Sequence, residues 1–349
     1  MDSTSEAREY LKGKAVLVTG VCGTVGKQLA EQLLIQYDVG KLVGLDHNES
    51  ELVFLSERFG RDAPSEFILA DVRDCEALIR ETRGIDVIFH AAAYKHVHMC
   101  ERSPLEAIHT NIIGVQNVIQ AALRNNVKRL VFTSTDKAVN STNVMGTSKL
   151  MGERLITAAA CDIHMDGPVF LSTRFGNVLG SRGSVIPIFR EQIRNGGPIT
   201  LTDPAMTRFI MSLDEAVRLV IESVVLGNPG DVLITKMPSI RIGDLAQVMI
   251  RECSKLFSLR EKDIDINVVG HKPGEKLYEE LMNQEEIRRS VELGRFFVIR
   301  PPSKAKEKAT YANVITDRVE QAYHSGNVPT LTQQEIAEFL HRYRLLEDV

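Results

Sequence analysis

Short runs of β-branched and apolar residues alternate with helix-length segments through the first half of the chain. The runs typical of strands cover residues 15–20, 41–46, 66–72, 86–93, 129–135 and 169–175. They are almost continuously apolar, as in strands that are covered on both faces and therefore belong to a parallel sheet. Helix-like stretches such as 26–37 and 111–126 lie between them. The alternation predicts an α/β fold with a doubly wound parallel sheet of the Rossmann type.

This rhythm ends near residue 176. Gly, Pro and Ser gather in residues 176–187 and 195–206. A helix that opens with a capping box from Ser212 to Glu215 follows, and then a strand at 231–236. We expect a sheet domain over residues 1–176 and a smaller, mostly helical domain over 177–349, with some chain crossing back to the sheet.

The charge balance excludes some partners. The net charge of -4 provides no basic field for nucleic acid or for an anionic membrane. No apolar run reaches the ~20 residues of a membrane span, and the charged first residues do not form a signal peptide. We therefore expect a cytoplasmic protein that binds neither nucleic acid nor membrane. The five cysteines are scattered without a C-x-x-C pair, which favours reduced thiols.

A glycine-rich turn follows the first strand. In VLVTGVCGTVGKQL, Gly20, Gly23 and Gly26 lie after the strand and at the start of a helix, with Thr24 and Val25 between the last two. Glycine allows the backbone to bend sharply and to approach a pyrophosphate, and the start of the helix offers free N–H groups to that anion. The alternative is a tight turn without a ligand. The context after a strand favours a dinucleotide site.

Acidic and small residues at the next strand ends fit the same ligand. Asp46 follows Gly26 by 20 residues, where a carboxylate bonds an adenosine ribose and repels a 2′-phosphate, so NAD is favoured over NADP. Asp71 and Val72 are expected to end the third strand beside the adenine. Ala91 and Ala92, with Ala93, are expected to end the fourth strand, where small side chains let the cofactor pass.

The spacing G-x-x-G-x-x-G resembles the extended short-chain dehydrogenase/reductases, which act mostly on nucleotide sugars. Five segments look like the UDP-N-acetylglucosamine 4,6-dehydratases of bacterial capsule and flagellin-glycan synthesis: residues 90–97, 134–149, 172–187, 206–211 and 271–281. The resemblance runs from about residue 13 to 285. It implies NAD, a UDP-sugar substrate with a GDP-sugar as the alternative, and a homo-oligomer, either a dimer or a hexamer. Membrane-anchored relatives carry preceding helices, so this chain resembles the soluble forms.

Methionine stands where most such enzymes carry the tyrosine that moves a proton. Lys149 follows Met145 by four residues, on the same face of a helix. Inverting members of the family carry Tyr at the place of Met145, and retaining members carry Met. The resemblance therefore implies a retaining enzyme, in which Lys149 holds the nicotinamide ribose.

A 4,6-dehydratase oxidises the sugar at C4, eliminates water across C5 and C6, and returns the hydride to C6. Elimination needs an acid and a base. We expect Asp136 to be the acid for the C6 hydroxyl and Lys137 the base for the C5 proton, with the pKa of Lys137 lowered by the closed site. Without a tyrosine, Asp136, aided by Thr135 or a water, is expected to take the C4 hydroxyl proton as well.

The same resemblance implies substrate contacts. Asn177 would bond the diphosphate or the sugar, and Lys95 would lie beside them. Val185 and Thr200 would line the nucleoside pocket. Lys272 and Glu275 would hold phosphate and ribose, although many relatives have Arg at the place of Lys272, and Arg208 is a further phosphate candidate. Each of these could instead be a surface charge or a contact of the fold.

Two other functions stay open. An epimerase shares the fold and NAD but needs no Asp–Lys pair and normally keeps the tyrosine. A non-catalytic NAD-binding sensor or scaffold would have lost that tyrosine.

His96 and His98 form an H-x-H pattern without a carboxylate partner, so no metal site is expected. His90 is expected to be a packed residue at a strand end.

Overall fold

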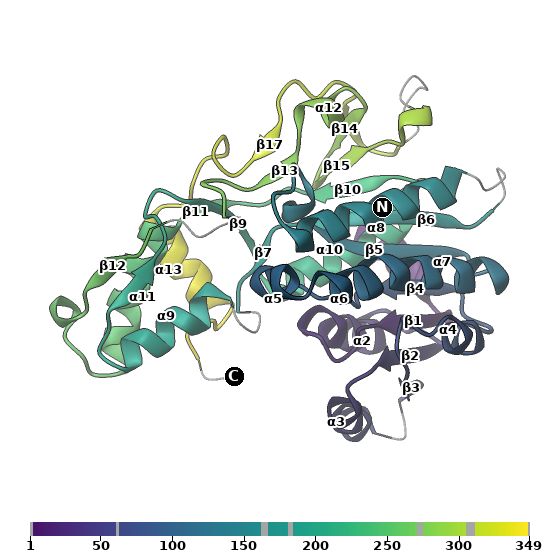
Figure 1. Cartoon of the computed structure of the whole chain (residues 1–349), viewed down its shortest axis with the longest axis horizontal. Helices are drawn as coiled ribbons and strands as arrows, with labels where there is room; N and C mark the ends of the chain where they lie inside the picture. The colour runs from purple at the N-terminus through teal and green to yellow at the C-terminus, as the bar shows by residue number, and fades with distance from the viewer. Residues whose placement is uncertain are drawn as a thin grey trace. The chain divides into compact units, whose positions relative to one another are not determined.

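The computed structural model describes residues 3–60, 63–161, 167–180, 184–270, 275–304 and 311–347. The chain divides into two compact units. Unit 1 comprises Met1–Phe175, Ala216–Lys236 and Met282–Ala322, and unit 2 comprises Gly176–Glu215, Met237–Leu281 and Tyr323–Val349. Figure 1 labels most of the helices and strands of the two units.

One large sheet organises unit 1. Its strand order is β16-β14-β15-β10-β6-β5-β4-β1-β2-β3. The neighbours from β10 to β3 are parallel, and β15, β14 and β16 extend the sheet with antiparallel pairs. The parallel part confirms the predicted Rossmann-type α/β fold. The strands are β1 (Ala15–Thr19), β2 (Lys41–Asp46), β3 (Ser65–Leu69), β4 (Val87–His90), β5 (Arg129–Thr135), β6 (Val169–Phe175), β10 (Val232–Thr235), β14 (Ser290–Leu293), β15 (Phe296–Ile299) and β16 (Val314–Thr316).

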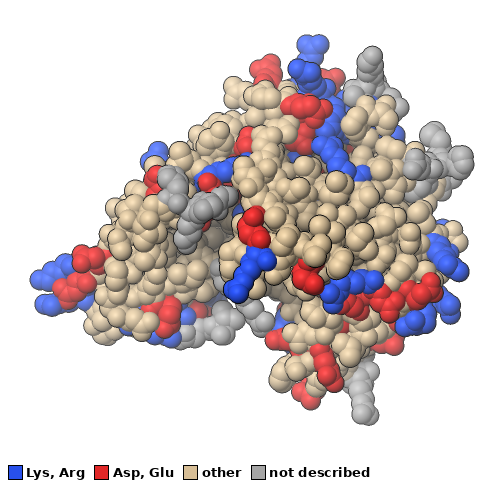
Figure 2. Space-filling view, viewed as in Figure 1, with Lys and Arg blue, Asp and Glu red and all other residues tan. Residues whose placement is uncertain are grey.

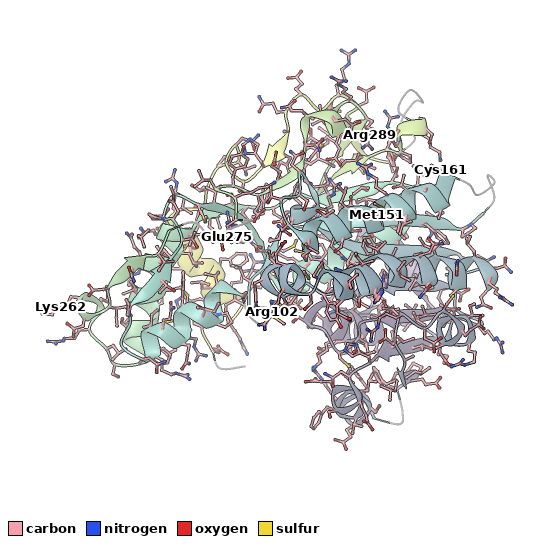
Figure 3. All side chains as sticks on the ribbon, in the orientation of Figure 1. Arg102, Met151, Cys161, Lys262, Glu275 and Arg289 are labelled. Atoms are coloured by element: carbon pink, nitrogen blue, oxygen red, sulfur yellow. The ribbon has the colours of Figure 1, made fainter. Side chains whose placement is uncertain are left out.

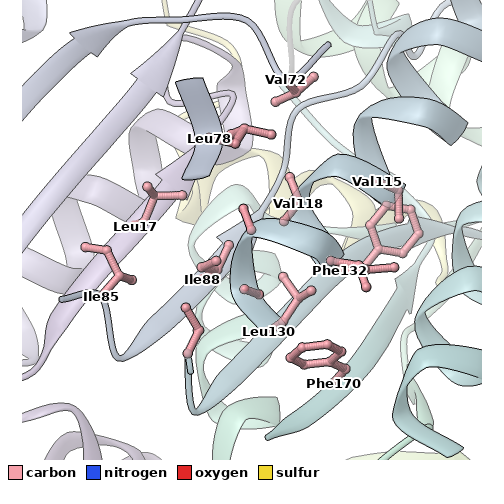
Figure 4. Close-up of a cluster of buried hydrophobic side chains, with 14 of the residues drawn as sticks. Leu17, Val72, Leu78, Ile85, Ile88, Val115, Val118, Leu130, Phe132 and Phe170 are labelled. Carbon is pink, nitrogen blue, oxygen red and sulfur yellow. The ribbon is translucent and has the colours of Figure 1, made fainter. Parts of the chain in front are cut away.

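Both faces of this sheet are covered, because successive residues of its strands are buried. Leu17 and Val18 point to opposite faces of β1, and neither is exposed. On the face of Leu17, the side chains of Ile88, Leu130 and Phe170 join those of helices α4, α7 and α8 in one apolar cluster (Figure 4). Packing of this kind explains the continuous apolar runs of the sequence.

The helices and helical turns of unit 1 follow its strands in the predicted alternation. They are α1 (Ser3–Leu11), α2 (Thr24–Gln36), α3 (Glu49–Phe59), α4 (Cys75–Glu81), α5 (Val97–Arg102), α6 (Pro104–Ile108), the π-helical turn η1 (His109–Ile113), α7 (Gly114–Arg124), the 3-10 turn η2 (Asp136–Ala138), α8 (Val144–Cys161), α12 (Gln284–Ile287) and the 3-10 turn η4 (Pro302–Lys304). Helix α10 (Leu213–Leu226) begins in unit 2 and continues into unit 1. Its predicted capping box is present, because the Ser212 hydroxyl accepts the Glu215 N–H and the Glu215 carboxylate accepts the Ser212 N–H.

Two strands are shorter than predicted. Strand β3 ends at Leu69 and β4 at His90, so Asp71, Val72 and Ala91–Ala93 lie in the loops that follow. The last backbone bond between β4 and β1 joins the Ala91 N–H to the Thr19 carbonyl. Beyond this bond the chain after β4 leaves the sheet, and Ala91–Ala93 border a pocket. The chain after β3 leaves the sheet as well, and the Asp71 side chain there accepts a hydrogen bond from its own loop.

Unit 2 combines helices with short strands. Helix α11 packs against α9 and α13, and the apolar side chains of Ile193, Leu245, Met249 and Leu340 meet in its core. The strands form the groups β11-β9-β7, β12-β8 and β13-β17, of which β13 ends in unit 1. Bounds are β7 (Asn177–Val178), α9 (Val185–Arg194), β8 (Ile199–Leu201), β9 (Thr207–Met211), β11 (Ser239–Arg241), α11 (Ile242–Leu256), the 3-10 turn η3 (Glu261–Asp263), β12 (Ile266–Val268), β13 (Glu280–Met282), β17 (Tyr323–His324) and α13 (Gln333–Arg342).

Charged side chains of both signs are interspersed on the face shown in Figure 2. Within the described ranges, no helix combines the length and the apolar character that crossing a bilayer requires.

Candidate active site

A pocket of about 260 Å³ lies in unit 1 at the carboxyl ends of β1, β2 and β4. Ligands of open α/β sheets bind at this edge. The lining comes from the glycine-rich turn, from the end of β2, and from the loops after β3 and β4. It includes Gly20, Cys22, Gly23, Asp46, His47, Asn48, Asp71, Val72, Arg73, Ala91, Ala92, Ala93 and Tyr94.

The glycine-rich turn brings three segments into close contact. Gly20 has a φ of +71°, and a Cβ there would lie 2.6 Å from the backbone nitrogen of Ala92. A Cβ on Gly26 would lie 2.1 Å from the Gly20 carbonyl oxygen. Only glycine therefore allows β1, the loop after β4 and the start of α2 to approach one another in this way.

The start of α2 leaves its amides available to a ligand. Gly23 occupies the N-cap position and provides no side-chain hydrogen bond. By contrast, the side chains of Asn48 and Asp74 cap α3 and α4. The first N–H groups of a helix need acceptors, and a diphosphate would supply them here. Thr24 and Val25 are the first two residues of this uncapped helix.

Asp46 is held at the edge of the pocket with its side chain nearly buried. Its Oδ2 accepts the Cys22 N–H at 3.0 Å, and its Oδ1 accepts the Asn48 N–H at 3.1 Å. These bonds fix the carboxylate at the end of β2, where a ribose hydroxyl could donate to its remaining lone pairs. The pocket, the uncapped helix and this carboxylate together fit an adenine dinucleotide.

Arg73 is a pocket residue that the sequence analysis missed. Its Nη2 lies 2.6 Å from Oδ2 of Asp71, and its Nη1 lies 3.1 Å from Glu106. Burial favours a higher pKa for Asp71, but the hydrogen bonds and charge of Arg73 outweigh it and lower that pKa. The neighbouring Val72 is buried in the core beneath Gly114 as well as touching the pocket.

Thr135, Asp136 and Lys137 form one hydrogen-bonded group where β5 ends. The Asp136 carboxylate accepts the Thr135 hydroxyl at 2.8 Å and the Lys137 ammonium at 3.0 Å, both through Oδ1. Asp136 is 1% exposed, and its Oδ2 has no hydrogen-bond partner among the described residues. The structure thus brings together an acid and a base with one carboxylate oxygen unused.

Helix α8 begins directly against this group. A Cβ on Gly146 would lie 2.0 Å from the Lys137 carbonyl oxygen. Met145 is buried in a small apolar cluster with Cys100 and Ala107. Gly146 lets α8 lie against η2, and unlike Met145 it was not predicted from the sequence as a residue of the site.

Lys149 is buried one helical turn after Met145. Its Nζ lies 4.1 Å from the centroid of the Phe132 ring, a cation–π contact. Burial lowers the pKa of Lys149 to about 7, although the charge of Glu153 acts in the opposite direction. A buried amine in this condition exchanges its proton near neutral pH.

Three neighbouring side chains of adjacent strands lie next to Lys149. Thr19, His90 and Phe132 are register partners on β1, β4 and β5. Oγ1 of Thr19 and Nδ1 of His90 share a hydrogen bond of 2.6 Å, and the rings of His90 and Phe132 are stacked at 5.7 Å. Burial, and then the charge of Lys149, lower the pKa of His90 to about 3, so the imidazole is neutral. His90 is the packed strand-end residue that the sequence predicted.

Asn111 joins the pocket loop to α8. Its Oδ1 accepts the Tyr94 N–H at 2.8 Å, and its Nδ2 donates to the Tyr94 carbonyl at 3.0 Å and to Ser148 Oγ at 2.9 Å. Asn111 lies in the π-helical turn η1, so the helical stretch predicted over 111–126 is π-helical at its start and α-helical from Gly114 to Arg124. The sequence carries no signal for this residue, because a π-helical turn shifts the phase of the helical pattern.

Glu153, in the middle of α8, belongs to a buried ion network. Arg174 donates to Glu153 at 2.7 and 2.6 Å and to Glu286 at 3.0 and 2.8 Å. All three side chains are buried. Burial opposes charge on these groups, yet the two carboxylates raise the pKa of Arg174 and its guanidinium lowers that of Glu286. This network was not predicted from the sequence, although Arg174 lies in residues 172–187, one of the segments that resemble the dehydratases.

Most predicted substrate residues belong to unit 2. Asn177 forms part of β7 and Val185 starts α9. The Thr200 hydroxyl on β8 accepts a hydrogen bond from Gln192 at 2.8 Å. Glu275 is exposed in the segment before β13 (Figure 3), and Lys272 lies outside the described residues.

Arg208 on β9 is engaged within unit 2. Its Nη1 donates to the Thr207 carbonyl at 2.8 Å, and its Nε lies 3.5 Å from Glu279. A phosphate would have to share or displace these contacts.

Lys95, His96 and His98 follow the pocket loop in unit 1. Lys95 is exposed, next to the lining residue Tyr94. The rings of His96 and His98 are tilted with centroids 6.1 Å apart. Burial, followed by the charges of Lys95 and His98, lowers the pKa of His96. In the described part of the chain, no three His, Cys, Asp or Glu side chains are grouped so that they could hold a metal ion.

Curated relatives cover most of this chain. The Methanocaldococcus jannaschii protein named "Uncharacterized membrane protein MJ1061" is 46% identical over 84% of this chain and 87% of its own length. CapD of Staphylococcus aureus, a capsular polysaccharide biosynthesis protein, is 40% identical, and the matched part spans 82% of this chain but only 48% of CapD. A UDP-glucose 4-epimerase of Rickettsia canadensis is 35% identical over 94% of this chain and 95% of its own.

A solved structure and a family model agree with this similarity. Pen from Bacillus thuringiensis has a TM-score of 0.89 at 39% identity, covering 97% of this chain and all of that chain. The model of the family described as polysaccharide biosynthesis protein matches residues 16–301. With most of its length inside that match, the chain is a member of the polysaccharide biosynthesis protein family, within the extended short-chain dehydrogenase/reductases that the glycine spacing indicated.

Proposed function

We propose that the protein is a nucleotide-sugar 4,6-dehydratase. It would convert UDP-N-acetylglucosamine to UDP-2-acetamido-2,6-dideoxy-4-hexulose, with retention at C5. The observation that carries the proposal is the buried Asp136 carboxylate bonded to Lys137 at 3.0 Å, at the carboxyl edge of the sheet. Eliminating water needs an acid and a base on adjacent carbons of the sugar, and this pair supplies both.

The cofactor of the proposal is NAD, held by the pocket in unit 1. Gly20, Gly23 and Gly26 would admit the diphosphate, which the N-terminus of α2 binds, and Asp46 would bond the adenosine ribose. NAD, when bound, would accept a hydride from C4 and return it at C6. Asp71, Val72, Ala91 and Ala92 would border the cofactor, and Lys149 would bond the nicotinamide ribose.

In the elimination, one proton moves within the Asp136–Lys137 pair. Transfer from the Lys137 ammonium to the Asp136 carboxylate leaves a neutral amine and a carboxylic acid. The amine would take the C5 proton, while the acid would protonate the departing C6 hydroxyl. The Thr135 hydroxyl holds the same Oδ1, and therefore orients the carboxyl so that Oδ2 is the unused atom.

The remaining assignments rest on the family resemblance. Asn177, Val185, Thr200, Arg208, Lys272 and Glu275 would bind the UDP-sugar, together with Lys95. Met145 would pack without reacting, as in retaining members. We also propose a cytoplasmic location and a homo-oligomer, either a dimer or a hexamer. GDP-N-acetylglucosamine is the alternative substrate.

A UDP-sugar 4-epimerase is the second candidate. The full-length similarity to a Rickettsia epimerase favours it. An epimerase also begins with oxidation at C4, but it needs no acid at C6. The buried, bonded Asp136–Lys137 pair therefore favours the dehydratase, and it argues equally against a non-catalytic NAD-binding sensor.

The test is to incubate the protein with UDP-N-acetylglucosamine in deuterated water and to follow the sugar by proton NMR. A dehydratase gives a new C6 methyl signal with deuterium at C5, and the couplings among the ring protons H1, H2 and H3 report retention or inversion through the ring conformation. Asp136→Asn and Lys137→Ala should abolish the methyl signal, whereas Lys14→Ala, at the opposite edge of the sheet, should leave it unchanged. Conversion to the C4 epimer without a methyl signal would establish the epimerase instead.

A further inference from the structure

We propose that Lys149 is the catalytic base that takes the proton of the sugar C4 hydroxyl. The inference rests on the proposed function only through its first step, oxidation at C4, which a 4-epimerase shares. It assigns to a lysine the proton transfer that a tyrosine at position 145 would perform.

The proton count of the Asp136–Lys137 pair requires a third group. Joined at 3.0 Å, the pair holds one proton, as carboxylate and ammonium or as acid and amine. The second form provides the acid at C6 and the base at C5 and leaves no base for C4. If Asp136 took the C4 proton first, the pair would have to start as a carboxylate beside a neutral amine. In that state the 3.0 Å bond would join a carboxylate to a neutral amine and would lose the charge assistance of the ion pair, so that state is disfavoured. The count therefore argues against the double role expected for Asp136 from the sequence.

Helix α8 offers one group in place of the tyrosine. Met145 has no proton to exchange and is buried with Cys100 and Ala107. One turn further along α8, Lys149 is 6% exposed, and its Nζ lies over Phe132 of β5, the strand that ends at Thr135. Lys149 thus lies about one turn along α8 from Gly146, where α8 touches η2, and its amine lies over the middle of the strand that leads to the Asp136–Lys137 pair.

The surroundings of Lys149 compensate its charge only through the face of the Phe132 ring. Among the described residues, its Nζ has neither a carboxylate nor a hydrogen-bond acceptor as a direct partner. Glu153, one turn along the helix, is bound to Arg174 through both of its oxygens. Burial and the charge of Lys149 lower the pKa of His90 on β4 to about 3, so its imidazole is too weak a base to compete for the proton and carries no charge that could balance that of Lys149.

Ionisable groups on the elements that pack against α8 do not change this conclusion. Glu153, which belongs to α8 itself, is the charge that acts appreciably on Lys149, and burial outweighs it. The others belong to η2, β5, β6, α5, α6, α7 and η1: Asp136, Lys137, Arg129, Arg174, His98, Cys100, Glu101, Arg102, Glu106, Arg124 and His109. The amine form of Lys149 is therefore populated at neutral pH.

The step balances. The O4–H bond breaks and its proton joins the lone pair of Lys149 Nζ, while the C4–H electron pair leaves as hydride to the cofactor and C4=O forms. After elimination, Asp136 has given a proton to the departing water and Lys137 holds the C5 proton. Lys137 returns its proton to C5 when the hydride reaches C6. Lys149 then returns its own proton, through solvent, to Asp136.

Two substitutions separate a base from a cation that only binds the ribose. Lys149→Arg keeps a charge and hydrogen-bond donors but cannot deprotonate. It should lower turnover by about 10²-fold or more while the affinity for NAD, measured by calorimetry, changes little. Lys149→Ala should regain turnover with added methylamine, in proportion to the unprotonated amine, and not with methylguanidinium. Lys14→Ala, which removes another lysine beside an aromatic ring, should behave like the parent.

Titration of the protein without ligands provides an independent measurement. With ¹³Cε-labelled lysine, the NMR signal that Lys149→Arg removes should titrate near neutral pH. A midpoint at the ordinary lysine value of ~10.4 would overturn the proposal. Near-parent turnover of Lys149→Arg, or equal rescue by methylguanidinium, would overturn it too. If the parent protein gives no methyl signal with UDP-N-acetylglucosamine, the proposed dehydratase fails, and the titration still decides the ionisation of Lys149.

Discussion

The carbonyl oxygen of Lys137 lies 2.0 Å from the place that a Cβ would take on Gly146, so α8 and the turn that carries Asp136 touch backbone to backbone. Any side chain at position 146 would push α8 away from η2. Because α8 carries Met145 and Lys149, such a shift would move the proposed base relative to the Asp136–Lys137 pair.

We therefore expect Gly146→Ala to lower the free energy of unfolding by about 1–3 kcal/mol and turnover by about 10²-fold. Thermal unfolding and the NMR assay measure the two effects. Gly294→Ala is the matched control, because a Cβ there meets nothing within 4 Å and it should change neither quantity. Full activity of Gly146→Ala would show that α8 tolerates displacement from η2.

Asp46→Asn tests the ribose site. The amide keeps one acceptor for the Cys22 N–H but loses the charge, so we expect NAD affinity to fall by about 1.5–3 kcal/mol and discrimination against NADP to weaken. Calorimetric titration with both cofactors measures this change. Asp74→Asn, which retains a capping oxygen for α4, should bind both as the parent does. Unchanged NAD affinity in Asp46→Asn would remove Asp46 from the cofactor site.

The raised pKa of Asp231 predicts that the free energy of unfolding depends on pH. It is buried before β10 and accepts the Asn228 N–H at 2.8 Å and the Tyr311 hydroxyl at 2.9 Å. Burial raises its pKa to about 7 despite these bonds. An unfolded Asp has a pKa of ~3.9, so between roughly pH 4 and 7 the folded state binds more protons than the unfolded one. The contribution of this group to stability is therefore largest below pH 4 and falls as the pH rises to 7.

Asp231→Asn removes this term. Relative to the parent, the variant should gain about 3 kcal/mol of unfolding free energy between pH 4 and 8. Urea unfolding at both pH values measures the difference. Parallel pH dependence in the two proteins would mean that Asp231 titrates normally.

Arg174→Met leaves Glu153 and Glu286 buried without their cation. Breaking a buried ion pair by removing one partner costs about 3–5 kcal/mol, and we expect that loss in urea unfolding at pH 7. Arg194→Met removes an exposed partner of Glu191 and should cost less than about 1 kcal/mol. Equal losses in the two variants would show that burial does not matter at Arg174.

Met145→Leu tests whether the methionine reacts. Met and Leu are nearly equal in volume, so stability should fall by less than about 1.5 kcal/mol in a cluster with Cys100 and Ala107. Turnover in the NMR assay should stay close to that of the parent. A large loss of turnover at preserved stability would give the sulfur a role that packing does not explain.

Local chemistry made much of unit 1 predictable from the sequence. The apolar runs marked the strands of the parallel sheet, and the spacing of Gly20, Gly23 and Gly26 marked the turn before α2. Ser212 and Glu215 marked a helix start. Each signal acts over a few residues, so a single sequence displays it.

Contacts between distant segments were not predictable in this way. The need for glycine at 146 arises from a carbonyl in another element, and the role of Asn111 depends on a π-helical turn. Strands β14, β15 and β16 join the sheet far along the chain, and at three or four residues each they are too short to show a periodic pattern. Nothing in the sequence distinguishes Arg174 from another arginine in a strand, because its partners Glu153 and Glu286 are distant along the chain.

The pairing of Arg174 with Glu286 also constrains how the protein is made. Glu286 leaves the ribosome 112 residues after Arg174, roughly 6–22 s later at ordinary translation rates of about 5–20 residues per second. During that interval the guanidinium at the end of β6 has Glu153 as a partner but not Glu286. The parallel sheet of the nascent chain therefore emerges before its charge network is complete.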